Sequence, residues 1–254
     1  MDLTMINIKS VSKGGKAFYL AYDQGFEHGP QEFDETNVDP LEIINIAKRG
    51  GYNGLIVHKG IADKYHKEIK ASKVPLILKL NGKTNLTGGE PLSRAICSVS
   101  EAISLGAKAV GYTVYVGSKH ESIMLKEFED ILREAHKEKV PVIAWVYPRG
   151  KVVNDKSPRE LMAYAARIGL EIDADLIKIK GDGVISDLSW AVQAAGRAKV
   201  VFAGGEKTTE KEFISNTKKV VASGAFGVAV GRNIWKSNDP VSLSKKIRGI
   251  VFGK

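Results

Sequence analysis

The chain contains one cysteine, few histidines and no long apolar run. With Cys97 alone, it cannot form an intramolecular disulfide, which fits a reducing compartment. No segment approaches the ~20 consecutive apolar residues needed to span a bilayer. Residues 1–4 include an acid and lack the basic-then-apolar layout of a signal peptide. The sequence therefore predicts a cytoplasmic protein that does not bind a membrane.

Metal-binding patterns are also missing. The five histidines show no H-E-x-x-H or comparable ligand spacing, and His28 beside Glu27 is the only candidate pair. A zinc-dependent aldol mechanism normally needs several converging histidines. We therefore expect no metal site and no cofactor.

The formal net charge of +9 comes from lysines and arginines spread along the chain. The sequence has no arginine-rich arm and no basic stretch interleaved with aromatic residues, which nucleic-acid binding would favour. A lysine-rich solvated surface, or the steering of small anions, explains the charge. Phosphorylated metabolites are thus favoured over nucleic acid as partners.

Apolar runs of strand length alternate with amphipathic stretches of helix length along all 254 residues. The expected strands are residues 17–23, 54–57, 75–80, 107–115, 141–147, 175–180, 199–203 and 227–230. The expected helices are residues 40–49, 61–70, 92–105, 121–137, 158–171, 188–195, 209–223 and 240–251. Eight such pairs without a linker predict an α/β protein, a (β/α)8 TIM barrel formed by a single domain, 1–254. A doubly wound open sheet is the alternative.

The sixth expected strand carries two lysines. Side chains alternate along a strand, so Lys178 and Lys180 share one face while Ile177 and Ile179 share the other. If the isoleucines pack against helices, both lysines point into the barrel. Mutual repulsion and desolvation would then lower the pKa of an amine and make it nucleophilic. The other interpretation, that these lysines bind phosphate or pair with a neighbouring acid, is about equally favoured by the spacing.

The fifth expected strand places Trp145 and Tyr147 on its inner face near the barrel mouth. A tyrosine hydroxyl there can shuttle protons, although both aromatics would also serve simply as packing. Asp23, at the end of the first expected strand, can assist proton transfer or form a structural ion pair with a barrel lysine such as Lys79.

Glycines follow the last two expected strands. Gly204 and Gly205 end the seventh, and Gly231 precedes Arg232 after the eighth. Glycines in these two loops allow backbone N–H groups to approach a phosphate, and an arginine adds a charged fork. Tight turns without a ligand are the alternative interpretation.

Across residues 16–253 the sequence resembles the archaeal-type class I fructose-1,6-bisphosphate aldolases, which have bacterial relatives. The resemblance is carried by residues 21–30 (AYDQGFEHGP), 78–84 (LKLNGKT), 145–150 (WVYPRG), 178–180 (KIK) and 230–235 (VGRNIW).

The resemblance implies a (β/α)8 barrel without a metal, a Schiff base on Lys178 and Lys180 close by. It assigns proton transfer mainly to Tyr147, supported by Asp23, and it places Trp145 in the site wall. It implies that one phosphate is held by Gly204, Gly205, Gly231 and Arg232. His28, Arg149 and Lys151 are candidates for the second phosphate, and the family implies a homo-oligomer, a pentamer or decamer.

Three alternatives share many of these residues. One is a related Schiff-base enzyme, 2-amino-3,7-dideoxy-D-threo-hept-6-ulosonate synthase of aromatic amino-acid biosynthesis. The segment from Gly25 to Pro30 looks more like the aldolase branch. The others are a non-catalytic sugar-phosphate binder and a basic protein that docks nucleic acid.

Overall fold

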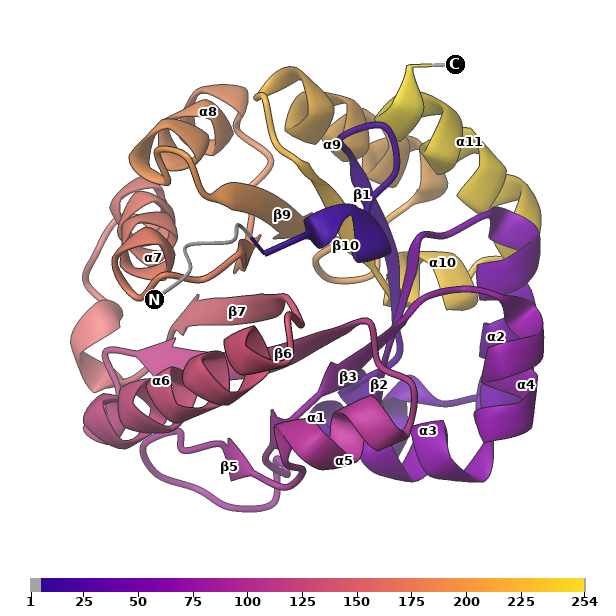
Figure 1. Ribbon diagram of the computed structural model, residues 1–254. Helices are drawn as coiled ribbons and strands as arrows, with labels where there is room; N and C mark the ends of the chain where they lie inside the picture. Colours follow the sequence, from indigo (N-terminus) through magenta and orange to yellow (C-terminus); the bar gives the residue numbers. More distant parts are fainter. Residues whose placement is uncertain (1–5, 254) are drawn as a thin grey trace.

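Eight parallel strands close into a barrel in the computed structural model, which describes residues 6–253 (Figure 1). Residues 1–4, on which the expectation about a signal peptide rests, lie outside the described residues. The strands are β1 (Ala17–Ala21), β2 (Gly54–His58), β3 (Leu76–Lys79), β6 (Ala109–Val116), β7 (Val142–Pro148), β8 (Leu176–Lys180), β9 (Lys199–Ala203) and β10 (Gly227–Val230). Pairing of β1 with β10 closes the ring, so the predicted (β/α)8 fold is confirmed and the open sheet is excluded.

Helices surround this barrel (Figure 1). The outer helices are α2 (Pro40–Gly50), α3 (Lys59–Lys64), α4 (His66–Ser72), α5 (Val99–Ser104), α6 (Glu121–Lys137), α7 (Pro158–Glu171), α8 (Ile185–Ala194), α9 (Glu210–Ala222) and α11 (Pro240–Phe252). Shorter pieces are η1 (Ile8–Val11), α1 (Gln24–His28), η2 (Pro30–Glu32), η3 (Lys151–Val153) and α10 (Arg232–Trp235), and β4 (Asn81–Gly82) pairs with β5 (Arg94–Ala95). No helix within residues 6–253 is long and apolar enough to cross a membrane.

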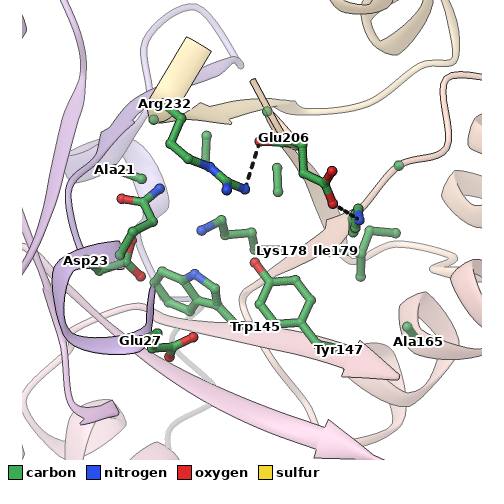
Figure 2. Close-up of a pocket in the computed structure, with 18 of the residues that line it drawn as sticks. Ala21, Asp23, Glu27, Trp145, Tyr147, Ala165, Lys178, Ile179, Glu206 and Arg232 are labelled. Carbon is green, nitrogen blue, oxygen red and sulfur yellow. Dashed lines mark hydrogen bonds and ion pairs between the residues drawn. The ribbon is translucent and has the colours of Figure 1, made fainter. Parts of the chain in front are cut away.

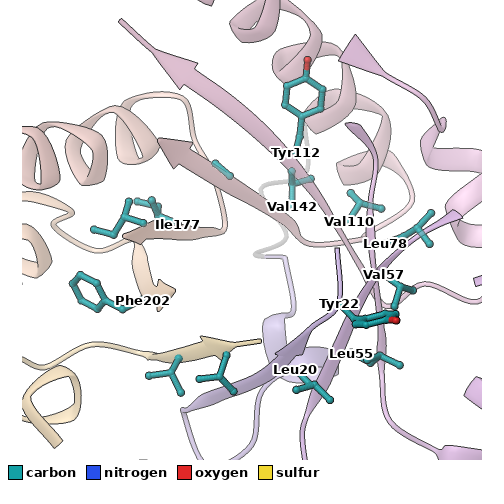
Figure 3. Packing of buried hydrophobic residues seen from close by; sticks show 14 of the residues in the cluster. Leu20, Tyr22, Leu55, Val57, Leu78, Val110, Tyr112, Val142, Ile177 and Phe202 are labelled. Carbon is teal, nitrogen blue, oxygen red and sulfur yellow. The ribbon is translucent and has the colours of Figure 1, made fainter. Parts of the chain in front are cut away.

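Alternation along the strands divides the core into two layers. Outward-facing residues such as Leu20, Val142 and Ile177 pack between the barrel and its helices (Figure 3). Inward-facing residues such as Tyr19 and Leu176 fill the barrel itself. The predicted inner and outer faces of β7 and β8 are thus confirmed, except at the last residue of each strand, whose side chain lies at the mouth of the barrel.

Local signals explain where the helices begin. Asp39 and Ser157 cap α2 and α7, and each is followed by a proline in the first turn. The predicted helix at 92–105 is too long, because Ser98 starts α5 with a capping box. The residues before it form β5 and then a bend, in which the Ile96 N–H donates to the Leu80 carbonyl. The predicted helix at 61–70 is two helices, α3 and α4, which meet at Tyr65.

The amino-terminal turn closes the end of the barrel opposite to the site described below. In Figure 1 this indigo segment lies across the strands, and Val11 of η1 is fully buried in the inner core layer. Apolar packing therefore fills that end of the barrel interior, and in barrels of this kind chemistry takes place at the carboxyl ends of the strands.

Candidate active site

A cavity of about 920 Å³ opens at the carboxyl ends of the strands. All but one of the predicted site residues line it, although they come from five different strands and the loops that follow them: Asp23, His28, Trp145, Tyr147, Arg149, Lys178, Lys180, Gly204, Gly205, Gly231 and Arg232. Lys151, a further candidate for the second phosphate, is not among its lining residues. The structure thus brings the predicted residues together in one site.

Lys178 lies inside the barrel, where only 5% of the residue is exposed. Its Nζ lies 4.9 Å from the centre of the Trp145 ring, and it forms no ion pair within 4.0 Å with any described residue. Burial lowers the pKa of Lys178 from 10.5 to about 8; Asp23 and Glu27 oppose the change, while the charge of Lys79 adds to it. About a tenth of this amine is therefore neutral at pH 7, several hundred times more than for a lysine with the ordinary pKa.

Lys180 behaves differently from the prediction. Its side chain is 63% exposed at the rim and pairs with Glu206 at 3.4 Å. The prediction that its charge faces Lys178 in a confined space is wrong, because β8 ends at Lys180 and the side chain lies in solvent above the ring of strands. Lys180 still lines the cavity mouth.

The second ammonium group inside the barrel belongs to Lys79. Its Nζ lies 3.4 Å from an Asp23 carboxylate oxygen and 3.1 Å from a Glu27 oxygen. Burial alone would lower the pKa of Lys79, but Glu27 and Asp23 overcome this effect and raise it. Lys79 consequently stays charged, and the predicted pairing of Asp23 with a barrel lysine such as Lys79 is confirmed.

Tyr147 extends from the end of β7, and in Figure 2 its hydroxyl points toward Lys178. Burial, together with the charges of Asp23 and Glu27, holds the pKa of Tyr147 well above its usual value. Asp23 lies two residues beyond the end of β1, at the start of α1; although burial opposes its ionisation, Lys178 and Lys79 hold its pKa well below the usual range. The site therefore combines a neutral phenol and a carboxylate beside one amine.

The glycine loops form the other side of the cavity. A Cβ on Gly231 would lie 2.4 Å from the Gln24 Nε2, and Gly205 has a φ of +73°, which other residues rarely adopt. Asn233 fixes the loop after β9 by donating to the carbonyls of Gly204, at 2.9 Å, and Glu206, at 2.8 Å. Backbone N–H groups in such rigid glycine loops can approach a phosphate closely.

Arg232 lies beside these glycines. Its Nη1 pairs with Glu32 at 2.9 Å, and its Nη2 donates to the Gly205 carbonyl at 3.4 Å. Its Nε is buried and has no hydrogen-bond partner among the described residues. An anion in the cavity would satisfy this donor.

His28 and Arg149 lie on the α1 side of the mouth. Burial first, then the charge of Arg232, lowers the pKa of His28, so the imidazole is neutral at neutral pH. The Arg149 guanidinium lies 5.1 Å from the centre of the Tyr115 ring and 5.8 Å from that of Tyr147. Arg149 is thus a cation placed close to Tyr147.

Three residues that shape the site were not predicted as catalytic or phosphate-binding residues: Glu27, Glu32 and Asn233. Glu27 and Glu32 follow the first strand within a few residues of Asp23, but only their partners, Lys79 and Arg232, reveal what they contact. Those partners are distant in the sequence, so no local pattern could have identified the pairs. No group of three His, Cys, Asp or Glu residues suited to a metal occurs within residues 6–253.

This fold and this site define a barrel aldolase with a buried amine and a glycine-lined anion site in one cavity. The sequence profile of the DeoC/LacD family aldolases matches residues 17–237. The chain belongs to this family and, within it, to the archaeal-type class I fructose-bisphosphate aldolases, so the predicted resemblance is confirmed.

Two similar proteins support this assignment. The class 1 fructose-bisphosphate aldolase of Thermoproteus tenax is 46% identical over 99% of this chain and 95% of its own length. A solved archaeal fructose-1,6-bisphosphate aldolase, whose catalytic lysine is covalently bound to the carbinolamine intermediate, is 46% identical with a TM-score of 0.91. That structure covers 97% of this chain and 98% of its own. The 2-amino-3,7-dideoxy-D-threo-hept-6-ulosonate synthase 1 of Archaeoglobus fulgidus is 32% identical over 96% of this chain and 88% of its own length.

Proposed function

We propose that this chain is a class I fructose-1,6-bisphosphate aldolase, a metal-independent lyase of glycolysis and gluconeogenesis. It reversibly cleaves its substrate to dihydroxyacetone phosphate and glyceraldehyde 3-phosphate. The observation that carries the proposal is the buried Lys178, whose pKa is lowered to about 8. This amine lines the same cavity as the glycine loops that follow β9 and β10.

The reaction is simplest to follow in the direction of synthesis. The neutral Nζ of Lys178 attacks C2 of dihydroxyacetone phosphate, and loss of water gives an iminium ion. The iminium draws electrons from C3, which loses a proton and leaves an enamine. The enamine attacks the aldehyde carbon of glyceraldehyde 3-phosphate, and water then hydrolyses the new iminium to release the ketose. Cleavage is the reverse of these steps.

Tyr147 and Asp23 handle the protons in this scheme. Because its pKa is raised, Tyr147 is a neutral donor that supplies a proton to the aldehyde oxygen as the carbon–carbon bond forms. Donation leaves Tyr147 as a phenolate, and in cleavage, the reverse step, this phenolate takes the proton of the C4 hydroxyl. Asp23, a carboxylate close to the amine, supports proton movement during imine formation, and Trp145 forms the floor beneath the amine.

Phosphate recognition sets the position of the ketose. We assign the phosphate of the dihydroxyacetone half to Gly204, Gly205, Gly231 and Arg232, where a buried Nε lacks a partner. Arg149, His28 and Lys180 line the other parts of the mouth and are the candidates for the second phosphate.

Borohydride trapping tests the proposal. Incubation with fructose 1,6-bisphosphate and borohydride should leave a stable adduct on Lys178, detected by peptide mass spectrometry, and cleavage should persist in EDTA. Lys178→Met should abolish both activity and adduct, whereas Lys180→Met, two residues along the same strand, should still form the adduct. Inactivation without an adduct, or an active Lys178→Met variant, would refute the mechanism.

Tyr147→Phe separates imine formation from bond cleavage. Because the phenol transfers the proton of the C4 hydroxyl, its loss should lower turnover by roughly 10²–10⁴-fold. Adduct formation with dihydroxyacetone phosphate should continue, because that step needs only the amine and Asp23. Unchanged turnover would remove Tyr147 from its role.

The heptulosonate synthase remains a second candidate activity that uses the same amine. The 46% identity to a fructose-bisphosphate aldolase, against 32% to the synthase, favours the aldolase. A panel of phosphosugars offered to the wild-type enzyme distinguishes the two. A non-catalytic sugar-phosphate binder would bind these compounds without cleaving any of them.

We further propose that residues 1–254 form one domain that assembles as a cytoplasmic homo-oligomer, a pentamer or decamer, and takes phosphorylated sugars rather than nucleic acid or membranes. Large apolar side chains exposed on α7 and α8, among them Tyr164 and Trp190, support an assembly. Sedimentation at several concentrations tests it, and a monomer throughout would refute it.

A further inference from the structure

The inner mouth of the barrel holds an uneven set of charges. One ammonium, Lys79, lies between two carboxylates, Asp23 and Glu27, and all three side chains are at least 88% buried. One of the two carboxylate charges is balanced by Lys79 and the other is not. When Lys178 is neutral, this buried group therefore carries one net negative charge.

Other titratable groups around the amine do not supply the missing positive charge. Burial and the charge of Lys79 lower the pKa of His58 of β2, so this imidazole is neutral. Tyr19, Tyr115 and Tyr147 have raised pKa values and are also neutral. Each of these groups faces the barrel from a different direction, and none of them carries a charge at neutral pH.

Two arginines lie farther out. Arg232 is paired with Glu32 at 2.9 Å, and Lys236 is paired with the same carboxylate at 3.1 Å, so this outer group keeps one positive charge. The groups that act on the Lys178 amine are Asp23, Glu27 and Lys79, and Arg232 is not among them. Arg149 lies at the exposed mouth, where water screens its charge. The amine of Lys178 is thus the place inside the barrel where one positive charge is missing.

Glu27 is the source of this imbalance. It comes from α1, one helical turn beyond Asp23, and accepts hydrogen bonds from Lys79 at 3.1 Å and from the Tyr115 hydroxyl at 3.3 Å. Without Glu27, Lys79 and Asp23 would cancel, and a cation on Lys178 would have no counter-charge. With Glu27 present, Lys79 is shared, and the Asp23 carboxylate keeps part of its charge for Lys178.

We propose that Glu27 is a positioning residue that acts through Lys79. By sharing Lys79 with Asp23, it leaves one net negative charge inside the barrel, and the iminium ion on Lys178 supplies the positive charge that balances it. The inference rests on the proposed Schiff-base mechanism and deepens it. The iminium carries a fixed positive charge, whereas the free amine and the ketone are neutral. Preorganised negative charge therefore stabilises the intermediate more than the reactants, and stabilisation of this kind accelerates a reaction.

The proposal predicts opposite effects for the two partners. Glu27→Gln removes a negative charge and should move the acidic limb of the kcat/KM profile about one pH unit lower, because the amine loses its proton more easily. Lys79→Gln removes a positive charge and should move the limb upward by a similar amount. The double variant restores the original charge, so its limb should return close to the wild-type position.

Turnover and binding should separate in the Glu27→Gln variant. We expect kcat to fall roughly ten- to a hundredfold, because the iminium loses its counter-charge. The KM for fructose 1,6-bisphosphate should change little, because Glu27 lies away from the glycine loops and Arg232. Borohydride trapping at a fixed time should yield less adduct than in the wild type.

A matched control is available outside the barrel. Glu127 likewise accepts a hydrogen bond from a tyrosine, Tyr112, at 2.6 Å and pairs with a cation, Arg94, but it lies on α6. Glu127→Gln should leave the pH profile unchanged. A purely structural role for Glu27 would lower activity at every pH without moving the limb.

The outcomes are distinct. A limb that stays in place in Glu27→Gln, or moves in the same direction in both single variants, would overturn the charge proposal. The proposal would also be overturned if the acidic limb of the double variant did not return to the wild-type position. If Lys79→Gln does not fold, the comparison of Glu27→Gln with Glu127→Gln decides alone. Absence of any adduct on Lys178 in the wild type would instead refute the proposed function.

Discussion

Gly111 of β6 determines whether the floor of the site can form. An added Cβ would lie 1.6 Å from the Cζ3 and 2.0 Å from the Cη2 of the Trp145 ring, distances that real Cβ atoms do not show. Trp145 is only 1% exposed, and its ring can move away from Gly111 only toward the cavity that it lines. The same ring lies under both Lys178 and Lys79, at 4.9 Å and 5.4 Å from their Nζ atoms. Gly111→Ala should therefore displace the floor on which both amines rest.

The expected loss follows from overpacking. Forcing a methyl group into a filled core costs about 1–3 kcal/mol of the free energy of unfolding. For a protein of this size, that cost lowers the midpoint of thermal unfolding by roughly 2–10 °C. Cleavage of fructose 1,6-bisphosphate should fall as well, because Trp145 can no longer support Lys178. Circular dichroism melts and steady-state kinetics measure the two effects.

A compensating change tests the cause. Trp145→Phe removes the outer ring atoms that Gly111→Ala would strike, so the double variant should be more stable than the two single effects predict, by at least about 1 kcal/mol. Gly60→Ala is the matched control, because Gly60 lies in α3 and an added Cβ there meets nothing within 4 Å. That change should be neutral or stabilising by up to about 1 kcal/mol. A Gly111→Ala variant with wild-type stability and activity would refute the reasoning.

Three other predictions concern the amine, the phosphate site and a helix cap. The kcat/KM of the wild type should rise with pH through about 8, because Lys178 becomes neutral there; a limb near 10, typical of a free lysine, would contradict this. Arg232→Met should raise KM roughly ten- to a hundredfold, because charge-assisted hydrogen bonds to phosphate are lost. An unchanged KM would show that the phosphate does not bind at Arg232. Thr209→Ala removes the capping box that Thr209 forms with Glu212 at the start of α9. It should cost about 0.5–2 kcal/mol in chemical denaturation with kinetics unaffected, and a kinetic defect would show that α9 affects the site.

The fold was predictable because its rules are local. Isoleucines and valines at every second position identify the buried strands, and residues such as Ser157 with Pro158 mark helix starts. The errors occur where long-range contacts decide. Residues 92–97 have a helical composition, yet Arg94 and Ala95 form β5, and Ile96 and Cys97 form a bend in which both N–H groups donate to the Leu80 carbonyl.

The site was predictable only in part. The two-residue period of β8 correctly turns Lys178 inward, but it cannot say where the ring of strands ends, so Lys180 was placed too deep. The partner of Asp23 lies 56 positions away on another strand, and only barrel closure brings it within 3.4 Å. Sequence patterns identify which residues carry chemistry, whereas the balance among their charges depends on tertiary contacts.

The low pKa of Lys178 also has a consequence for stability. In the folded state this pKa is about 8, below the ordinary value of 10.5, so the fold disfavours the protonated amine. The unfolded chain binds more protons between these values, and folding stability therefore rises with pH across this window. Below pH 8 the full penalty applies, which amounts to about 3 kcal/mol at most.

Lys178→Met should therefore make the protein more stable while making it inactive. Methionine fills a similar space but has no group that titrates. Urea denaturation at pH 7 should therefore show a free energy of unfolding about 1–3 kcal/mol higher than that of the wild type. The gain should shrink as pH rises from 8 toward 10.5, because the wild-type amine is then neutral in both states. Lys180→Met, at the exposed rim, should show no such pH-dependent gain. Equal stability of wild type and Lys178→Met at all pH values would mean that the barrel does not hold this amine against its protonation.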